Sequence, residues 1–287
     1  MNLLLRLALG LLLSGGIALL AWRRSALTAS GALGAVLVGT AIFGFGGLAW
    51  GMLLITFFVL STLLSHYKES VKERIAAEKF DKGSVRDLGQ ALANGGAGAG
   101  IAALAFLFLP EPVMLAAFVG AMATVNADTW ATEIGVLSRR TPRLITTLQP
   151  VERGTSGGVT WLGTLATAAG GLAIGLGALL FLALDAPLSR LGLGALAHPG
   201  MGRLIWLLLV SLAGGLGGSL FDSLLGASVQ AIYYCPACQK ETEKRVHGCG
   251  TPTRLVRGWR WLNNDLVNFA ASVFGALAAA GLWLLVN

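Results

Sequence analysis

The sequence predicts an all-α fold: a polytopic bundle of about eight transmembrane helices with a small cytoplasmic loop that is zinc-knuckle-like. Hydrophobic residues make up 55% of the 287 residues and charged residues only 12%, whereas a soluble domain carries about 25% charge. The chain also contains 40 glycines, and small residues let membrane helices pack closely. We therefore expect a single integral membrane domain, residues 1–287, with a cytoplasmic loop insert at 233–262.

Apolar runs define the expected spans, because a helix needs about 20 apolar residues to cross the bilayer. The first run has no small-residue cleavage site after it, so we expect it to be retained as a helix. In chain order, the expected spans are 3–21, 27–45, 48–65, 88–109, 113–137, 157–184, 203–232 and 264–286.

Basic residues fall in alternate connections between these spans. Of the 21 Lys and Arg residues, 18 lie in the connections that follow the first, third, fifth and seventh spans. The positive-inside rule makes that side cytoplasmic and both termini extracytoplasmic. We therefore expect a multi-pass protein of the cytoplasmic membrane, with its large loops and active face in the cytoplasm. The same placement accounts for the net charge of +7, so membrane lipids, and no nucleic acid, are the expected partners.

Glycines mark possible irregularities in two spans. The run from Ala213 to Gly218 in the seventh span weakens a helix by roughly 1 kcal/mol per glycine. We expect either a helix break, which usually lines a cavity, or a close helix contact at this run. Gly34 and Gly39 in the second span are expected to be ordinary packing positions.

Polar side chains at membrane depth need a partner or a function, because a carboxylate there costs about 2.5–3.5 kcal/mol. The first such group opens the fourth span. Asp87, Gln90 and Asn94 share one helix face that runs inward from Arg86. They belong to a site, or they are a capping Asp and two side chains that hydrogen-bond between helices.

The second group lies in the cytoplasmic half of the fifth span. Asn126, Thr129 and Glu133 share a helix face, and Asp128 neighbours that face. Two carboxylates with two further oxygen donors are the hard ligands that Mg²⁺ prefers. The alternative is a buried carboxylate neutralised by an arginine from a loop.

The third group is in the seventh span, where Asp222 shares a face with Ser219 and Gln230. The alternative for Asp222 is a hydrogen bond across the bundle. Several carboxylates close together would repel one another without a cation. We therefore expect Asp128, Glu133 and Asp222 to hold Mg²⁺.

The connection between the fifth and sixth spans carries four arginines, among them Arg143 and Arg153, and then a glycine-rich turn that we expect to open a helix. Such a turn offers free N–H groups and a positive dipole end to a phosphate, and nearby arginines hold phosphate oxygens. The alternative is a positive-inside loop with a capping Thr or Ser. The residues of the turn are Gly154, Thr155, Ser156, Gly157 and Gly158.

All three cysteines lie between 235 and 249, which is too clustered for a disulfide framework and suits a reducing compartment. The pattern C-x2-C-x8-H-x-C supplies four ligands of the type that Zn²⁺ takes in a structural knuckle. The alternatives are a free dithiol or a loop without metal. The four candidate ligands are Cys235, Cys238, His247 and Cys249.

Two further segments flank the candidate site residues. Asn264 and Asn268 lie one turn apart at the start of the eighth span, where amides either bind a nucleobase or sugar or join helices. Segment 66–87 mixes lysines with acids, so we expect a solvated helix at the membrane surface and assign it no catalytic role.

Long ordered segments of the chain resemble one known family. They include "RDLGQALANGG" from residue 86, "NADTWATEIGVLS" from 126, "PRLITT" and "ERGTSGGVTWLG" from 142 and 152, "GSLFDSLLGA" from 218 and "WLNNDLVN" from 261. This sequence is similar over nearly its whole length to the integral membrane family, domain of unknown function ninety-two, that contains the plant phytyl-phosphate kinase and the animal transmembrane protein nineteen. The family also looks distantly like CTP-dependent lipid kinases and cytidylyltransferases such as dolichol kinase.

The resemblance implies a membrane-embedded, Mg²⁺-dependent kinase that transfers a phosphate from a nucleoside triphosphate, possibly CTP, to an isoprenoid (phytyl or prenyl) monophosphate. The metal would sit on the carboxylates named above, bridging nucleotide phosphates. Arg143, Arg153 and the glycine-rich turn would hold phosphate oxygens, and Arg86, with Asp87 beside it, would contact the second phosphate. Asn94 and Asn126 would position the ligands.

Two alternatives remain open from the sequence. Cytidylyl transfer to a lipid phosphate would use the same residues but would yield a CDP-lipid instead of a lipid diphosphate. A transporter would also explain glycine-rich helices and carboxylates within the membrane, although no inverted repeat is visible. The lipid's chain length, the preferred nucleotide and the oligomeric state are not determined by the sequence.

Overall fold

The computed structural model describes residues 3–76, 85–108, 112–184 and 201–286, and the rest of the chain, including part of segment 66–87, lies outside the described residues. Within these ranges, eight helices are long and apolar enough to cross a membrane, as predicted. The second span is a helix continued by a five-residue π-helix, η1. The spans are α1 (Leu3–Arg23), α2 (Ala29–Ala41) with η1 (Ile42–Gly46), α3 (Leu48–His66), α5 (Leu88–Leu107), α6 (Pro112–Gly135), α7 (Trp161–Ala183), α9 (Trp206–Ser228) and α10 (Asn264–Val286).

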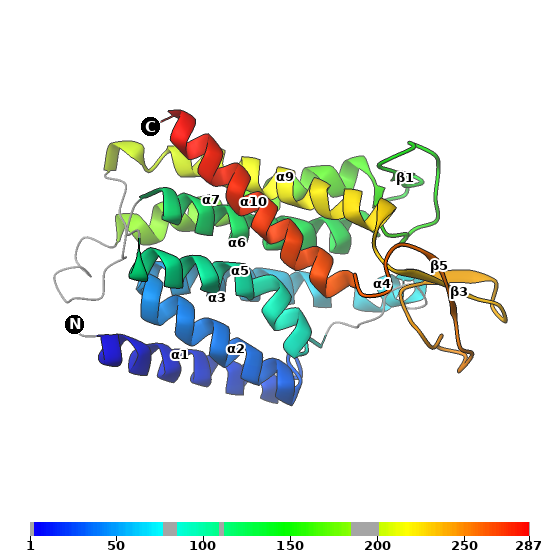
Figure 1. The fold of residues 1–287 in the computed structure, drawn as a ribbon, viewed down its shortest axis with the longest axis horizontal. Helices are drawn as coiled ribbons and strands as arrows, with labels where there is room; N and C mark the ends of the chain where they lie inside the picture. The colour runs from blue at the N-terminus through cyan, green and yellow to red at the C-terminus, as the bar shows by residue number, and fades with distance from the viewer. Residues whose placement is uncertain (1–2, 77–84, 109–111, 185–200, 287) are drawn as a thin grey trace.

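Because the number of spans is even, both termini must lie on the same side of the membrane. Figure 1 shows α4 (Glu69–Ala76) and the strands β1, β3 and β5 at one end of the bundle, while both termini lie at the other end. This end is the one that the positive-inside rule predicts to be cytoplasmic. The short 3-10 helix η2 (Met201–Arg203) precedes α9.

Helix α6 forms the centre of the bundle. It packs against α3, α5, α7, α9 and α10, and every residue from Leu115 to Ala127 is buried. Phe118 of α6 stacks on Trp50 of α3 with ring centroids 4.4 Å apart. Helix α1, in contrast, leaves Leu4 and Leu12 exposed, as expected of a helix that faces lipid.

The glycine run of the seventh span makes a close helix contact and not a break, since α9 is continuous through it. A Cβ added to Gly214 would lie 2.7 Å from the Cα of Gly120 in α6, and one added to Gly120 would lie 2.6 Å from the carbonyl oxygen of Gly275 in α10. Thr124 Oγ1 donates a hydrogen bond to the Gly214 carbonyl at 2.9 Å. We call Gly120, Gly214 and Gly275 the glycine junction. An unbroken helix keeps its backbone hydrogen bonds satisfied in lipid.

The irregular span is instead the second, where η1 ends at Gly46 and the next residue, Gly47, has a φ of 93°. Gly34 and Gly39 of α2 are packing positions, as expected. A Cβ on Gly34 would lie 2.8 Å from Ala91 Cβ, and one on Gly39 would lie 2.6 Å from Ser14 Cβ. These contacts hold α2 against α5 and α1.

Two small antiparallel sheets stand beside the helix ends. One is a hairpin of β1 (Arg143–Leu144) with β2 (Gly158–Val159). The other, in the predicted loop insert, has three strands in the order β4-β3-β5. It shortens the expected seventh span, because α9 ends at Ser228 and Ile232 already belongs to a strand. These strands are β3 (Ile232–Cys235), β4 (Lys240–Thr242) and β5 (Arg254–Arg257).

The glycine junction predicts that alanine substitutions at different glycines of α9 will differ in their effect on stability. Gly214→Ala should lower the free energy of unfolding by about 1–3 kcal/mol, because its methyl group would meet the rigid backbone of Gly120. Gly217→Ala is the matched control, since the nearest atom to its added Cβ is a ring carbon of Phe274 at 3.6 Å. Thermal unfolding in detergent measures the difference, and equal stabilities of the two variants would contradict this account.

Candidate functional site

A cavity of about 530 Å³ lies at the end of the bundle that holds the connections. Its lining comes from α4, from six of the spanning helices, from β2 and from the residues that follow β4. Twelve of the residues that the sequence singled out for chemistry line it. They are Arg86, Asn94, Asp128, Glu133, Gly154, Thr155, Ser156, Gly157, Gly158, Asp222, Asn264 and Asn268.

Two of the predicted polar residues do not line the cavity, because one caps a helix and the other joins two helices. Asp87 is the N-cap of α5: its carboxylate accepts from the backbone N–H of Gln90, and the Gln90 side chain accepts from the Asp87 N–H. This capping box is the alternative that the sequence left open. Asn126 is fully buried in α6 and donates through Nδ2 to the Gly170 carbonyl at 2.7 Å, joining α6 to α7.

Two predicted phosphate-binding arginines are also directed elsewhere. Arg143 donates to the carbonyl oxygen of Leu148 at 2.7 Å, and Arg153 donates to that of Arg139 at 3.2 Å. Both bonds are solvent-exposed and lie within the connection between α6 and α7. Neither arginine lines the cavity in this arrangement.

Three carboxylates from different parts of the chain gather in the cavity. Asp128 of α6 accepts a hydrogen bond from Ser219 of α9 at 3.1 Å. Asp222, one turn further along α9, interacts electrostatically with Asp128 and with Glu243, which follows β4. Oδ2 of Asp222 is buried and has no hydrogen-bond partner among the described residues. Carboxylates that share a cavity repel one another, and a bound cation or protonation of one carboxyl relieves that repulsion.

Glu133 is held in a different set of contacts. Its carboxylate forms a salt bridge with Lys72 of α4 and accepts a hydrogen bond from Ser65 of α3 at 2.7 Å. Lys72 also donates to the carbonyl oxygens of Leu64 and Ser65 at the C-terminal end of α3. This is the predicted alternative of a neutralised carboxylate, except that the cation is a lysine. It comes from a segment expected to be solvated, yet Lys72 is buried.

Arg86 brings a positive charge to the cavity from a fixed backbone. Its N–H donates to Ala26 and its carbonyl accepts from Thr28, at 3.1 and 3.0 Å. Its guanidinium donates to the hydroxyls of Ser61 and Thr62, each at 3.0 Å. Burial lowers the pKa of Arg86, an effect that the charge of Glu133 opposes, but arginine remains protonated in proteins. Within the described ranges, no carboxylate lies within salt-bridge distance of it.

The glycine-rich turn lines the cavity but does not open a helix, so that expectation is wrong. The strand β2 follows the turn, and Thr160 caps α7 by accepting from the Gly163 N–H at 3.0 Å. Gly154 and Gly157 have φ values of 78° and 81°, which favour glycine. A Cβ on Gly157 would also lie 2.5 Å from the backbone N of Ala227, so the turn packs directly on α9.

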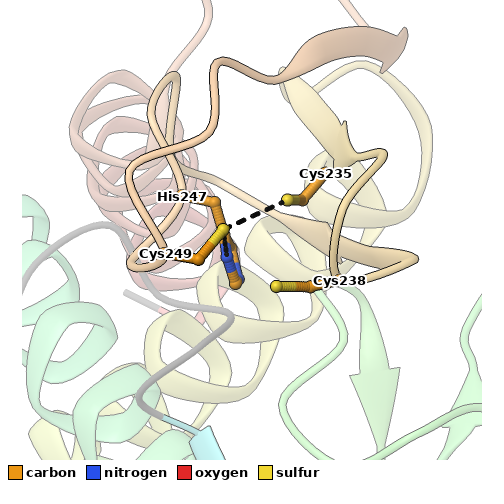
Figure 2. Close-up of side chains that lie close together, drawn as sticks. All are labelled: Cys235, Cys238, His247 and Cys249. Carbon is orange, nitrogen blue, oxygen red and sulfur yellow. Dashed lines mark hydrogen bonds between the residues drawn. The ribbon is translucent and has the colours of Figure 1, made fainter.

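The four predicted zinc ligands converge in the insert, as Figure 2 shows. One ligand atom from each of Cys235, Cys238, His247 and Cys249 lies within 4.8 Å of all the others. The Cys235 and Cys249 sulfurs are 3.7 Å apart, and Nδ1 of His247 is 3.2 Å from Cys249 Sγ.

The thiols of this cluster differ in acidity. Hydrogen bonding with Thr251, and then with His247, lowers the pKa of Cys249 to about 6. Hydrogen bonding with Cys249, and then burial, raises the pKa of Cys238 to about 11. The cluster thus favours a thiolate at Cys249, and thiolates are the form in which cysteine binds metals.

Sequence reasoning missed five charged groups that the fold brings into the cavity: Glu69, Lys72, Glu243, Lys244 and Asp265. Lys72 lies in a segment of mixed charge, where nothing in the pattern separates it from its neighbours. Glu243 lies between the second cysteine and the histidine of the metal-binding pattern. This position was a signal that the sequence offered for Glu243. If one cluster of ligands holds both ends of a loop, the residues between them are also held in a defined place.

Comparison with known proteins places this architecture in a family. Residues 12–276 match the family described as Integral membrane protein DUF92. Protein PGR of Arabidopsis thaliana is 33% identical over 279 residues, which cover 93% of this chain and 92% of the relative. An uncharacterized membrane protein of Methanocaldococcus jannaschii is 33% identical over 228 residues, covering 79% and 84% of the two chains.

A further relative, Protein VTE6, chloroplastic, of Arabidopsis thaliana, is 29% identical over 259 residues, which cover 88% of this chain and 64% of the relative. No solved structure matches the chain. The family match extends over nearly all eight spans and confirms the resemblance carried by the ordered polar segments. This multi-pass integral membrane protein therefore belongs to the DUF92 family of integral membrane proteins.

Proposed function

We propose that this protein is a Mg²⁺-dependent kinase that transfers the terminal phosphate of a nucleoside triphosphate to an isoprenoid monophosphate. The observation that carries the proposal is the group of carboxylates Asp128, Asp222 and Glu243 in a cavity that also holds the half-buried Arg86. A cation site beside a positive side chain is what phosphoryl transfer needs, because that reaction is catalysed mainly by positioning and charge stabilisation.

Asp128 and Asp222 are the best candidates for the magnesium ligands. The unpartnered Oδ2 of Asp222 offers a free oxygen, and Mg²⁺ typically takes one or two protein carboxylates together with water and substrate phosphates. Glu133 fits this role less well, because its charge is already balanced by Lys72. Asp128 and Asp222 would hold the ion, and its positive charge would offset the negative charge that develops during transfer.

Arg86 is the best candidate for holding the lipid phosphate. Its partners in the described structure are hydroxyls and the faces of two phenylalanines, so its charge remains available to an anion. Arginine binds phosphate oxygens through paired N–H groups. Lys244 and Asn94 line the same cavity and would contact the second substrate or the leaving group.

A second pocket gives the lipid tail a place. It has a volume of about 80 Å³ and lies between α1, α2, α3 and α5, lined mostly by apolar side chains. Arg86, Gln90 and Asn94 line both this pocket and the polar cavity. A lipid phosphate with its head group at Arg86 would therefore extend the first part of its chain into apolar surroundings. This continuity favours an isoprenoid phosphate over a soluble phosphate.

Transfer of the phosphate to the lipid monophosphate requires no strong protein base. An oxygen of the lipid monophosphate attacks the γ-phosphorus, and an O–P bond forms as the bond to the β-bridging oxygen breaks. The products are a lipid diphosphate and a nucleoside diphosphate. The phosphate nucleophile is already ionised at neutral pH, so the protein contributes orientation and charge. The sequence resemblance to the family of the plant phytyl-phosphate kinase supports the same substrate class.

Replacing Asp128 with Asn should lower kcat roughly 100-fold or more, because the metal ion stabilises several kcal/mol of transition-state charge. The measurement is turnover of the purified protein with prenyl monophosphates of several lengths and each of CTP, ATP, GTP and UTP. The expected product is a lipid diphosphate. A CDP-lipid would establish the cytidylyltransferase instead, and full activity of the variant would remove Asp128 from the metal site.

Glu133 predicts a different phenotype. Glu133→Gln should lower the free energy of unfolding by about 1–3 kcal/mol, because it leaves the buried ammonium of Lys72 without its anion. The loss stays in this range because the pair is partly exposed and solvent screens its charges. The double variant Lys72→Met/Glu133→Gln should recover part of that loss. The Mg²⁺ concentration at half-maximal activity should change less than in Asp128→Asn. An unchanged unfolding temperature for the single variant would contradict the structural role.

The apolar pocket predicts a selective effect on the lipid substrate. Ala35→Phe adds a ring to the pocket lining and should raise the KM for a prenyl monophosphate about tenfold, with the KM for nucleotide unchanged. Leu37→Phe is the matched control on the same helix, because Leu37 is exposed and does not line the pocket. Equal KM values for lipid in the two variants would rule out this pocket as the tail site.

A further inference from the structure

The Cys/His cluster has the geometry of an ion site. Two thiolates at about 2.3 Å from a tetrahedral ion lie about 3.8 Å from each other. The sulfurs of Cys235 and Cys249 are separated by 3.7 Å. The other two ligand atoms lie within 4.8 Å of these and of one another. Three thiolates and one imidazole are soft and intermediate ligands, a set that selects Zn²⁺ over Mg²⁺.

His247 provides a separate indication. Its side chain is 5% exposed, and Nδ1 is directed at the sulfur of Cys249 (Figure 2). The second ring nitrogen, Nε2, is also buried and makes no hydrogen bond among the described residues. Burying an imidazole is costly when its polar atoms lack partners. Coordination of a metal by a ring nitrogen would give that nitrogen a partner and offset part of the cost.

The cluster closes both ends of one segment. Cys235 is the last residue of β3, and Cys238 lies in the turn that leads to β4. His247 and Cys249 lie between β4 and β5. The segment enclosed by these two pairs contains Glu243 and Lys244, both of which line the cavity.

Glu243 links this segment to the helix ends. Its Oε1 accepts from the hydroxyl of Ser156 in the glycine-rich turn and from Nε2 of Gln230, both at 2.8 Å. Gln230 is 1% exposed and follows the C-terminal end of α9. One carboxylate therefore joins three parts of the cavity wall: the insert, the turn before β2 and the end of α9.

We propose that Cys235, Cys238, His247 and Cys249 bind one Zn²⁺ ion, and that this ion holds Glu243 in place against Ser156 and Gln230. The site is structural, because four protein ligands leave no open position for substrate. Metal binding and folding of the insert are coupled, since the ligands must be brought together before the ion is bound. The inference is independent of the proposed kinase reaction and goes beyond it.

The metal site is tested on the full chain purified in detergent. Elemental analysis should find one zinc per chain, and a thiol reagent should react slowly with all three cysteines. A strong zinc chelator should release the zinc and expose three reactive thiols per chain, which are all the cysteines of the protein. Freely reactive thiols with no zinc after growth in zinc-replete medium, or a Cys235–Cys249 disulfide, would overturn the site.

The link to the cavity is tested by hydrogen exchange. Cys238→Ser should lose zinc and increase amide exchange of residues 154–158 about tenfold. Glu243→Gln should keep its zinc and still increase exchange of the same residues, because it weakens the contacts with Ser156 and Gln230. Lys240→Ala, on the exposed part of β4, is the control and should change neither quantity. Unchanged exchange of residues 154–158 in zinc-free Cys238→Ser would overturn the link.

These readouts remain separate from catalysis. Zinc content, thiol reactivity and exchange are measured without nucleotide or lipid phosphate. A protein that binds zinc as expected but forms no lipid diphosphate would contradict the proposed function alone. A protein that forms lipid diphosphate but contains no zinc would contradict only the proposed zinc site.

Discussion

The backbone contact at the glycine junction is the constraint on which the candidate site depends. Gly120, Gly214 and Gly275 let α6, α9 and α10 approach until their main chains touch, and Thr124 bridges α6 to α9 at the same level. Asp128 lies one turn beyond Thr124, and Asp222 lies two turns beyond Gly214. The packing at the junction therefore fixes the depth and rotation at which the two carboxylates meet. Side chains larger than glycine would separate the helices and, with them, the acids.

The charges in the cavity lie in three groups. Glu133 and Lys72 compensate one another and also tie α6 and α4 to the C-terminal end of α3. Asp128, Asp222 and Glu243 bring negative charge to one place, whereas Arg86 is held by hydroxyls a short way around the same cavity. Fixed charges of opposite sign in one cavity suit a ligand made of a metal ion and a phosphate. The carboxylates would attract the metal ion, and the arginine would attract the phosphate.

The insert differs from the rest of the chain in how it is stabilised. The spans are held by glycine contacts and apolar packing in a medium that supplies little hydrophobic drive for helix association. The three-stranded sheet is small and stands outside the bundle, so its strands bury few large side chains. A sheet of this size needs a further constraint to be ordered, and the cysteine and histidine ligands are placed to supply one. Its contribution to the cavity, Glu243, makes the order of the insert matter to the site.

The sequence by itself determined the eight spans, their alternating charge and twelve of the residues that line the cavity, because apolar run length, loop charge and helical spacing are local properties. Only the tertiary structure decided which polar residues face the cavity. It assigned Asp87 to a helix cap, Asn126 to a contact with α7 and Glu133 to Lys72, and it added Glu243 from the insert. Such partners lie up to 87 residues apart in the chain, and no local pattern encodes which of several possible partners a side chain meets. That choice follows from how closely the helices pack, which only the assembled bundle fixes.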